Sequence, residues 1–122
     1  MLAGSGLIAL IGVADLDRAQ QFYGDTLGLA LRDERPFALV AEFGGVMLRI
    51  TAVDEPVAAP YSVLGWRVHD ITSAVDDLVS RGVPTLRYDG LTQDARGIWT
   101  TPGGVKIAWF RDPDGNVLSL TA

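Results

Sequence analysis

The sequence predicts an α+β fold made of two tandem β-α-β-β-β modules, because one pattern occurs twice in the 122 residues. Val13-Ala14-Asp15-Leu16 and Val68-His69-Asp70-Ile71 each join an apolar run to an apolar helix-like segment, at an offset of 55 (Asp15 to Asp70). The copies also end alike: residues 45–51 match residues 115–121 at an offset of 70 (Arg49 to Ser119). A duplicated unit allows equivalent positions to be compared within one chain.

The first copy predicts a strand, a helix and three further strands. Asp15 is placed to cap the helix, whose apolar residues recur at helical spacing until Gly28. Gly44-Gly45 predicts the two-residue turn of a hairpin, where positive φ is accessible to glycine. The expected strands are residues 7–13, 29–32, 37–43 and 46–51.

The second copy repeats this order with a longer insertion. Asp70 is placed to cap a helix that ends at Arg81-Gly82. The polar loop 89–96 has no counterpart in the first copy and is a candidate cover for a binding site. The residues expected to face inward from the helix are Ile71, Ala74, Val75, Leu78 and Val79. The expected strands are residues 61–68, 84–88, 97–101 and 105–110, with a last strand after the turn at 112–116.

Composition indicates one globular domain, residues 1–122, with modules 1–55 and 60–122 joined by a Pro/Ala-rich linker. The chain has no cysteine, which excludes disulfides and thiolate metal sites, and a net charge of −5, which disfavours nucleic acid as a partner. No apolar run reaches the roughly 18 residues of a membrane span, and no signal peptide is evident. We therefore expect a cytoplasmic protein without a membrane partner.

Residues 7–23, 61–79 and 105–121 resemble the vicinal oxygen chelate superfamily, which includes glyoxalase I, bleomycin-resistance proteins and extradiol dioxygenases. The resemblance is carried by Phe22-Tyr23 and Leu27-Gly28-Leu29 in the helical segment after Asp15, by the copy around Asp70, and by the run Phe110 to Asn116 before the last strand. It implies curved sheets that form a cup with the helices outside. In this superfamily, short chains of two modules commonly form homodimers, and we expect one here.

The resemblance also implies four metal-ligand positions, commonly two His in the first strands and two Glu in the last strands. In this sequence Ile8, Val63, Arg49 and Ser119 stand there. Two aliphatic side chains supply no lone pair, and a guanidinium remains protonated in proteins. The only histidine, His69, does not replace two imidazoles and is expected to be solvated at a strand–helix junction. We expect neither a metal nor another cofactor.

Arg49 has two interpretations that are not exclusive. Its guanidinium is suited to hold an anionic or carbonyl group of a ligand. Alternatively it pairs with Glu42, because pairing of Phe43 with Val46 in the hairpin places Glu42 diagonally from Arg49 on one face.

Arg67 shares strand parity with Val63 and Gly65, so we expect it on the cup side, although its position near the strand end also suits plain solvation. Trp99, Trp109 and Tyr88 offer flat surfaces for an aromatic ligand or serve as core. We expect one of the two tryptophans to line the cup. Ser119 is a possible hydrogen-bonding group but lacks a partner base for nucleophilic chemistry.

These observations favour a protein that binds or sequesters a small organic molecule without a metal. The expected ligand-binding residues are Arg49, Ile8, Val63, Ser119, Arg67, Trp99 and Trp109. One alternative is a glyoxalase-like lyase, isomerase or dioxygenase with a metal-free or non-standard site, for example one rebuilt from Glu42 with Asp33 or Glu34. Another is a partner-binding module with a filled cup. Catalytic residues are left open.

Overall fold

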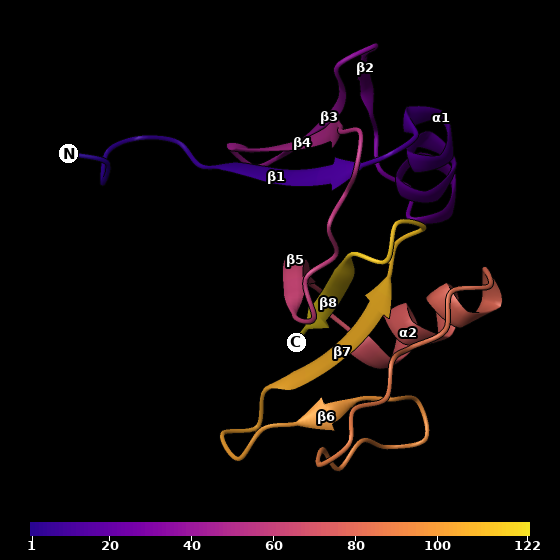
Figure 1. Cartoon of the computed structure of the whole chain (residues 1–122). Coiled ribbons are helices and arrows are strands. Elements are labelled where there is room, and N and C mark those ends of the chain that lie inside the picture. Colours follow the sequence, from indigo (N-terminus) through magenta and orange to yellow (C-terminus); the bar gives the residue numbers. More distant parts are fainter. The chain divides into compact units, whose positions relative to one another are not determined.

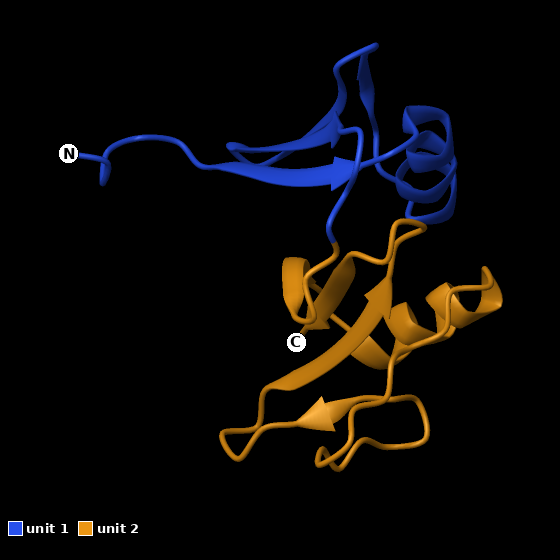
Figure 2. Ribbon diagram, viewed as in Figure 1, with its two compact units in different colours: residues 1–57 blue, residues 58–122 orange.

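The computed structural model describes residues 1–122, which divide into two compact units, Met1–Val57 and Ala58–Ala122 (Figure 2). Each unit has one helical segment and one four-stranded mixed sheet (Figure 1). The predicted α+β class and the β-α-β-β-β order of each module are confirmed. The boundary between the units falls inside the Pro/Ala-rich segment 53–60.

The first unit has strand order β1-β4-β3-β2, in which β1 and β4 run parallel and the other neighbours run antiparallel. The hairpin between β3 and β4 turns at Gly44-Gly45, whose φ values of 51° and 92° require the left-handed region that glycine adopts without strain. Its elements are β1 (Ile8–Val13), α1 (Leu16–Ala19), the π-helical η1 (Gln20–Thr26), β2 (Arg32–Glu34), β3 (Ala38–Phe43) and β4 (Val46–Ala52).

The predicted first helix forms, but most of it is wider than an α-helix. The Asp15 carboxylate caps its start by accepting hydrogen bonds from the N–H groups of Asp17 and Arg18. After α1 the backbone hydrogen bonds change from the α-helical to the π-helical pattern. Leu27 N–H, for example, donates to Phe22 O at 2.8 Å, an i→i−5 bond. The strand predicted at residues 29–32 is wrong in position, because the chain is still leaving the helix where Leu29 N–H donates to Tyr23 O.

The second unit has strand order β5-β8-β7-β6, again with one parallel pair, β5 and β8. This order corresponds strand by strand to that of the first unit, with β5, β6, β7 and β8 standing for β1, β2, β3 and β4. Its elements are β5 (Ser62–Arg67), α2 (Ile71–Ser80), β6 (Trp99–Thr100), β7 (Lys106–Arg111) and β8 (Val117–Thr121).

The strand predicted at residues 84–88 does not form. Leu86 N–H donates to Trp109 O of β7 at 2.8 Å, but other backbone groups of the segment bond to a side chain and not to a strand. The Gln93 amide accepts from Tyr88 N–H at 2.7 Å and donates to Leu86 O and Gly97 O, both at 2.8 Å. β6 is also shorter than the predicted strand 97–101, since the Ile98 N–H is taken by the Asp94 carboxylate.

Each sheet buries its face toward the helix, and Ala38, Val40 and Val117 on the opposite faces are buried as well. In the second unit α2 buries Ile71, Val75 and Leu78. Val79, predicted to face inward, is 54% exposed, because it lies one helical step beyond this stripe. The buried sheet residues on the helix side are Ile11, Val13, Leu39, Ala41, Leu48 and Ile50 in the first unit, and Ala108, Phe110, Leu118 and Leu120 in the second.

Candidate functional site

The two last strands, β4 and β8, place Arg49 and Ser119 at equivalent points of the two sheets. Arg49 lies opposite Leu10 of β1 and Val40 of β3. Ser119 lies opposite Gly65 of β5 and Trp109 of β7. The register therefore supports the alignment of the two copies, and both residues lie on the face turned away from the helix, which we call the far face of each sheet.

The side chains at the superfamily's metal positions do not fit a metal ion. Ile8 and Val63 carry only carbon, Arg49 carries a permanent positive charge, and Ser119 offers one neutral hydroxyl. In the whole structure, no group of three or more His, Cys, Asp or Glu side chains is arranged to hold a metal.

The carboxylates that a rebuilt metal site would need are paired with arginines. Arg32 contacts Glu34 at 3.0 Å and Glu42 at 3.9 Å. Asp33 accepts from the Arg35 backbone N–H at 2.9 Å, and this hydrogen bond, with a second one from the Arg35 guanidinium, lowers the pKa of Asp33. Asp33 also alternates to the other face of β2 from Glu34.

Arg49 does not form the predicted pair with Glu42. Glu42 does lie opposite Met47, as the hairpin register requires, but its ion pair is with Arg32. The part-buried Arg49 guanidinium instead contacts the Met47 sulfur, with Nη2 at 3.8 Å from Sδ. Arg49 has no carboxylate partner, so its charge is available to an anionic group.

The far face of the second sheet carries both tryptophans, not one of them as expected. Trp99 pairs with Ile107, which has the same strand parity as Trp109, so both indole rings lie on one face. Their centroids are 6.3 Å apart with planes 28° from parallel, and Tyr88 meets Trp109 edge to face at 5.2 Å. All three rings are partly exposed. The sequence does not tell whether Trp99 and Trp109 face the same side, because this depends on the turn between β6 and β7.

Arg67 lies on the same far face, where the parity argument placed it. It pairs with Thr121 of β8, and the row continues through Ile107 to Trp99. Arg67 is exposed and has no carboxylate partner. These four residues form one row on the far face that crosses all four strands, with Arg67 at one end and Trp99 at the other.

Val63 marks a point where the second sheet departs from the first. In the first unit Ile8 pairs with Met47 in an unbroken register. In the second unit the register shifts between Ser62 and Leu64, so Val63 has no partner on β8 and is 42% exposed. The shift moves Ser62 to the Ser119 side of the sheet, and their hydroxyl oxygens are 2.9 Å apart. Sequence analysis missed Ser62, because simple alternation groups it with Leu64 and the helix.

The loop at residues 89–96 is anchored to the rest of its unit. The Arg96 guanidinium donates to both carboxylate oxygens of Asp76 on α2, at 2.8 and 3.2 Å. These hydrogen bonds lower the pKa of Asp76 and raise that of Arg96. Arg87 holds the loop from the other side by donating to Gln93 O and Ala95 O.

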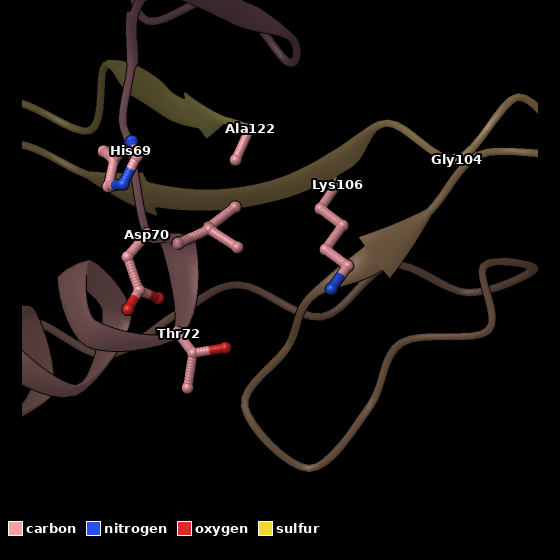
Figure 3. Close-up of a pocket in the computed structure, with 7 residues that line it drawn as sticks. His69, Asp70, Thr72, Gly104, Lys106 and Ala122 are labelled. Atoms are coloured by element: carbon pink, nitrogen blue, oxygen red, sulfur yellow. The ribbon is translucent and has the colours of Figure 1, made fainter.

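Two of the cavities of the molecule lie within the second unit. One, of about 540 Å³, lies beside Trp99 at the edge of the sheet and is lined by Thr92, Gln93, Asp94, Ile98, Trp99, Thr100 and Pro102. The other, of about 430 Å³, lies at the start of α2 and includes His69, Asp70, Thr72 and Lys106 (Figure 3). There the Asp70 carboxylate is already engaged as the α2 cap, accepting from Ser73 N–H at 3.1 Å. The first cavity falls in the size range of small-molecule sites and is lined by Trp99, one of the two tryptophans.

The sequence matches the family model of the Glyoxalase/Bleomycin resistance protein/Dioxygenase superfamily over residues 7–120, so the chain belongs to this superfamily. Membership defines the scaffold, and the reaction or ligand depends on the residues of the site. None of the curated proteins compared with the sequence matches it. The helix α2 has 10 residues, and α1 with η1 spans residues 16–26, so both are well short of the roughly 20 residues that a membrane-spanning helix needs.

Solved structures of similar proteins agree with this assignment. A glyoxalase family protein from Enterococcus faecalis is 24% identical with a TM-score of 0.71 and covers 100% of both chains. A superfamily member from Sphaerobacter thermophilus DSM 20745 is 21% identical with a TM-score of 0.74, over 99% of this chain and 98% of that chain. A glyoxalase/bleomycin resistance protein from Streptomyces sp. CB03234 is 27% identical with a TM-score of 0.69, over 97% of this chain and 100% of that chain.

Proposed function

We propose that this protein binds a small organic molecule with a planar aromatic ring and does so without a metal. The observation that carries the proposal is the pair of partly exposed tryptophans on one face, with Tyr88 against Trp109. A ring laid against an indole gains both apolar burial and a favourable ring–ring contact. The cavity of about 540 Å³ beside Trp99 has room for such a molecule.

The remaining ligand contacts in this proposal come from the second unit. Ser119 lies beside Trp109, Val63 offers apolar surface, and Arg67 is a cation without a carboxylate partner that suits an acidic group on the ligand. Within this proposal the ligand is released unchanged, since no base lies beside Ser119 to make it a nucleophile.

Titration calorimetry with aromatic molecules, using 2-naphthoate as a first probe, tests this proposal. Trp99→Leu and Trp109→Leu are each expected to weaken binding about tenfold, since they remove a stacking surface. Trp66→Leu is the matched control, because Trp66 stacks on Phe110 on the helix side of the sheet. Equal losses in all three variants contradict the proposed site. Mass spectrometry of the released ligand separates binding from turnover.

We also propose that the chain forms a homodimer. Strand β1 is an edge of the first sheet, and its apolar residues Ile8 and Leu10 are 52% and 62% exposed. Exposed apolar edge strands favour association. Light scattering after size exclusion should give twice the chain mass of 13.0 kDa. Leu10→Lys should shift it toward one chain mass, and a wild-type protein of one chain mass contradicts the proposal.

A further inference from the structure

The register shift in β5 produces a pair of serine hydroxyls on the far face of the second sheet. Ser62 pairs with Val117, two residues before Ser119 on β8, and this places both serines on the same side. Bulges of this kind redirect a side chain that regular alternation would send to the other face. Here the redirected side chain is a hydroxyl that meets Ser119 Oγ at 2.9 Å.

Gly65 is required for this arrangement. It lies directly opposite Ser119, and a Cβ built on it would come within 2.5 Å of Ser119 Oγ and 3.2 Å of the Ser119 carbonyl oxygen. Any side chain at residue 65 would therefore displace the Ser119 hydroxyl. Ser119 is partly exposed and lies between Gly65 on one neighbouring strand and Trp109 on the other.

The two hydroxyls can arrange their protons in two ways. Ser62 Oγ is within bonding distance of both Leu64 O, at 3.2 Å, and Ser119 Oγ, at 2.9 Å, but it has one proton. In one arrangement Ser119 donates to Ser62 and Ser62 donates to Leu64 O, so both protons are bonded within the protein. In the other, Ser62 donates to Ser119, and the Ser119 proton is left for an acceptor oxygen of a ligand, which would favour this second arrangement.

The charge on this face favours an acceptor that is anionic. The chain carries a net charge of −5, yet the far-face residues of β5, β8 and β7 from Gly65 onward include the cation Arg67 and no carboxylate. Arg67 stands two residues from Gly65 on the same strand, a rise of about 6.6 Å, within reach of its long side chain. A carboxylate at Ser119 is thus within the field of an unpaired guanidinium.

We propose that Ser62 and Ser119 form the polar half of the ligand site and that the ligand is an aromatic carboxylate. Its carboxylate oxygen accepts from the Ser119 hydroxyl, Ser62 orients that hydroxyl, and its ring lies against Trp109. The inference rests on the proposed function, since it takes the tryptophan face as the ring site. No covalent step is involved.

A matched pair of probes tests the proposal on the full chain. 2-Naphthoate and 2-naphthylmethylamine, protonated at pH 7, share a ring system and differ in the sign of the charge. Calorimetry at about 0.1 M salt should show 2-naphthoate binding at least about tenfold more tightly. Ser119→Ala should weaken 2-naphthoate about tenfold and leave the amine unchanged, because one charge-assisted hydrogen bond is lost.

Ser62→Ala gives a second measurement if Ser119→Ala impairs folding, which circular dichroism would reveal. It should weaken 2-naphthoate several-fold, because the Ser119 hydroxyl loses its orienting partner. Ser80→Ala is the control, since Ser80 caps α2 by donating to Asp77 O and should leave both affinities unchanged.

The outcomes separate the inference from the function on which it rests. If both probes bind equally and neither serine variant changes 2-naphthoate affinity, the aromatic site stands and the serine subsite is wrong. If neither probe binds, both the proposed function and the proposed role of Ser62 and Ser119 are wrong. Tighter binding of the amine also overturns the inference.

Discussion

The two sheets share a register but present different chemistry on their far faces. At the equivalent row, the first sheet carries Leu10, Arg49 and Val40, and the second carries Gly65, Ser119 and Trp109. A branched side chain in one copy thus corresponds to an absent side chain in the other. The comparison shows that the two units share a backbone topology but differ in their far-face side chains. These side chains decide what each unit can bind.

The sheets also differ in one feature of the backbone. Ile8 keeps the register of β1 with β4, whereas the register of β5 with β8 shifts beside Val63. The shift occurs at a strand position where the superfamily commonly has a metal-binding histidine. In this chain that position carries no donor, and the shift brings a neighbouring serine to the far face.

The substitution expected to have the largest effect is Gly65→Ala, which makes the second sheet more like the first. The new Cβ would stand 3.2 Å from a backbone oxygen and 2.5 Å from Ser119 Oγ, so either the strand or the serine must move. We expect a loss of about 1–3 kcal/mol in the free energy of unfolding and loss of most 2-naphthoate binding.

Urea denaturation and calorimetry measure both effects. Gly103→Ala is the control, because the nearest atom to a Cβ there is 3.8 Å away. Unchanged stability and affinity in Gly65→Ala would show that the space beside Ser119 is not needed.

An intermediate effect is expected from the unpaired arginine of the second sheet. Arg67→Gln should weaken 2-naphthoate about threefold at low salt, because it removes a cation that attracts the carboxylate. Near 1 M salt, where the screening length is about 3 Å, the difference from wild type should shrink.

Titrations at several salt concentrations make this comparison. Arg81→Gln is the control, since Arg81 pairs with Asp77 on α2 at 3.0 Å. If Arg67→Gln leaves the affinity unchanged at low salt, the Arg67 guanidinium does not contribute to the ligand site.

The smallest effect concerns the loop that only the second copy has. Asp76→Asn removes the charge that Arg96 binds, and a small fall in melting temperature at neutral pH is expected. The Arg96 hydrogen bonds lower the pKa of Asp76 below its ordinary value of 3.8, so the carboxylate form is favoured by folding. Its contribution is complete above that ordinary pKa and is lost as pH falls through the lower folded pKa.

Thermal melts from pH 7 to pH 2 check this pH dependence. The difference between wild type and Asp76→Asn should be constant down to about pH 4 and vanish below. A difference that grows on acidification contradicts the sign of the pKa shift.

Much of the site's position was predictable because alternation and duplication are local properties. Alternation along β5 places Gly65 and Arg67 on the far face and Leu64 and Trp66 on the helix side, and the structure agrees. The offset of 70 residues makes Arg49 and Ser119 equivalent, and the register agrees.

The errors have physical causes that lie outside any one segment. The strand predicted at residues 84–88 fails because only Leu86 N–H bonds to the neighbouring strand β7, while the Gln93 side chain takes the Leu86 carbonyl and the Tyr88 N–H. The Glu42–Arg49 pair fails because Arg32, on a strand whose position was mispredicted, reaches Glu42.

By itself, the sequence determined the repeated fold and the lack of metal donors at four equivalent positions, because hydrophobic period and residue chemistry are written in the chain. Only the tertiary structure decided that both tryptophans share a face and that Ser62 joins Ser119 there. The reason is that side-chain alternation holds only within an uninterrupted strand. Where a turn or a register shift intervenes, the face is set by pairing with a partner strand.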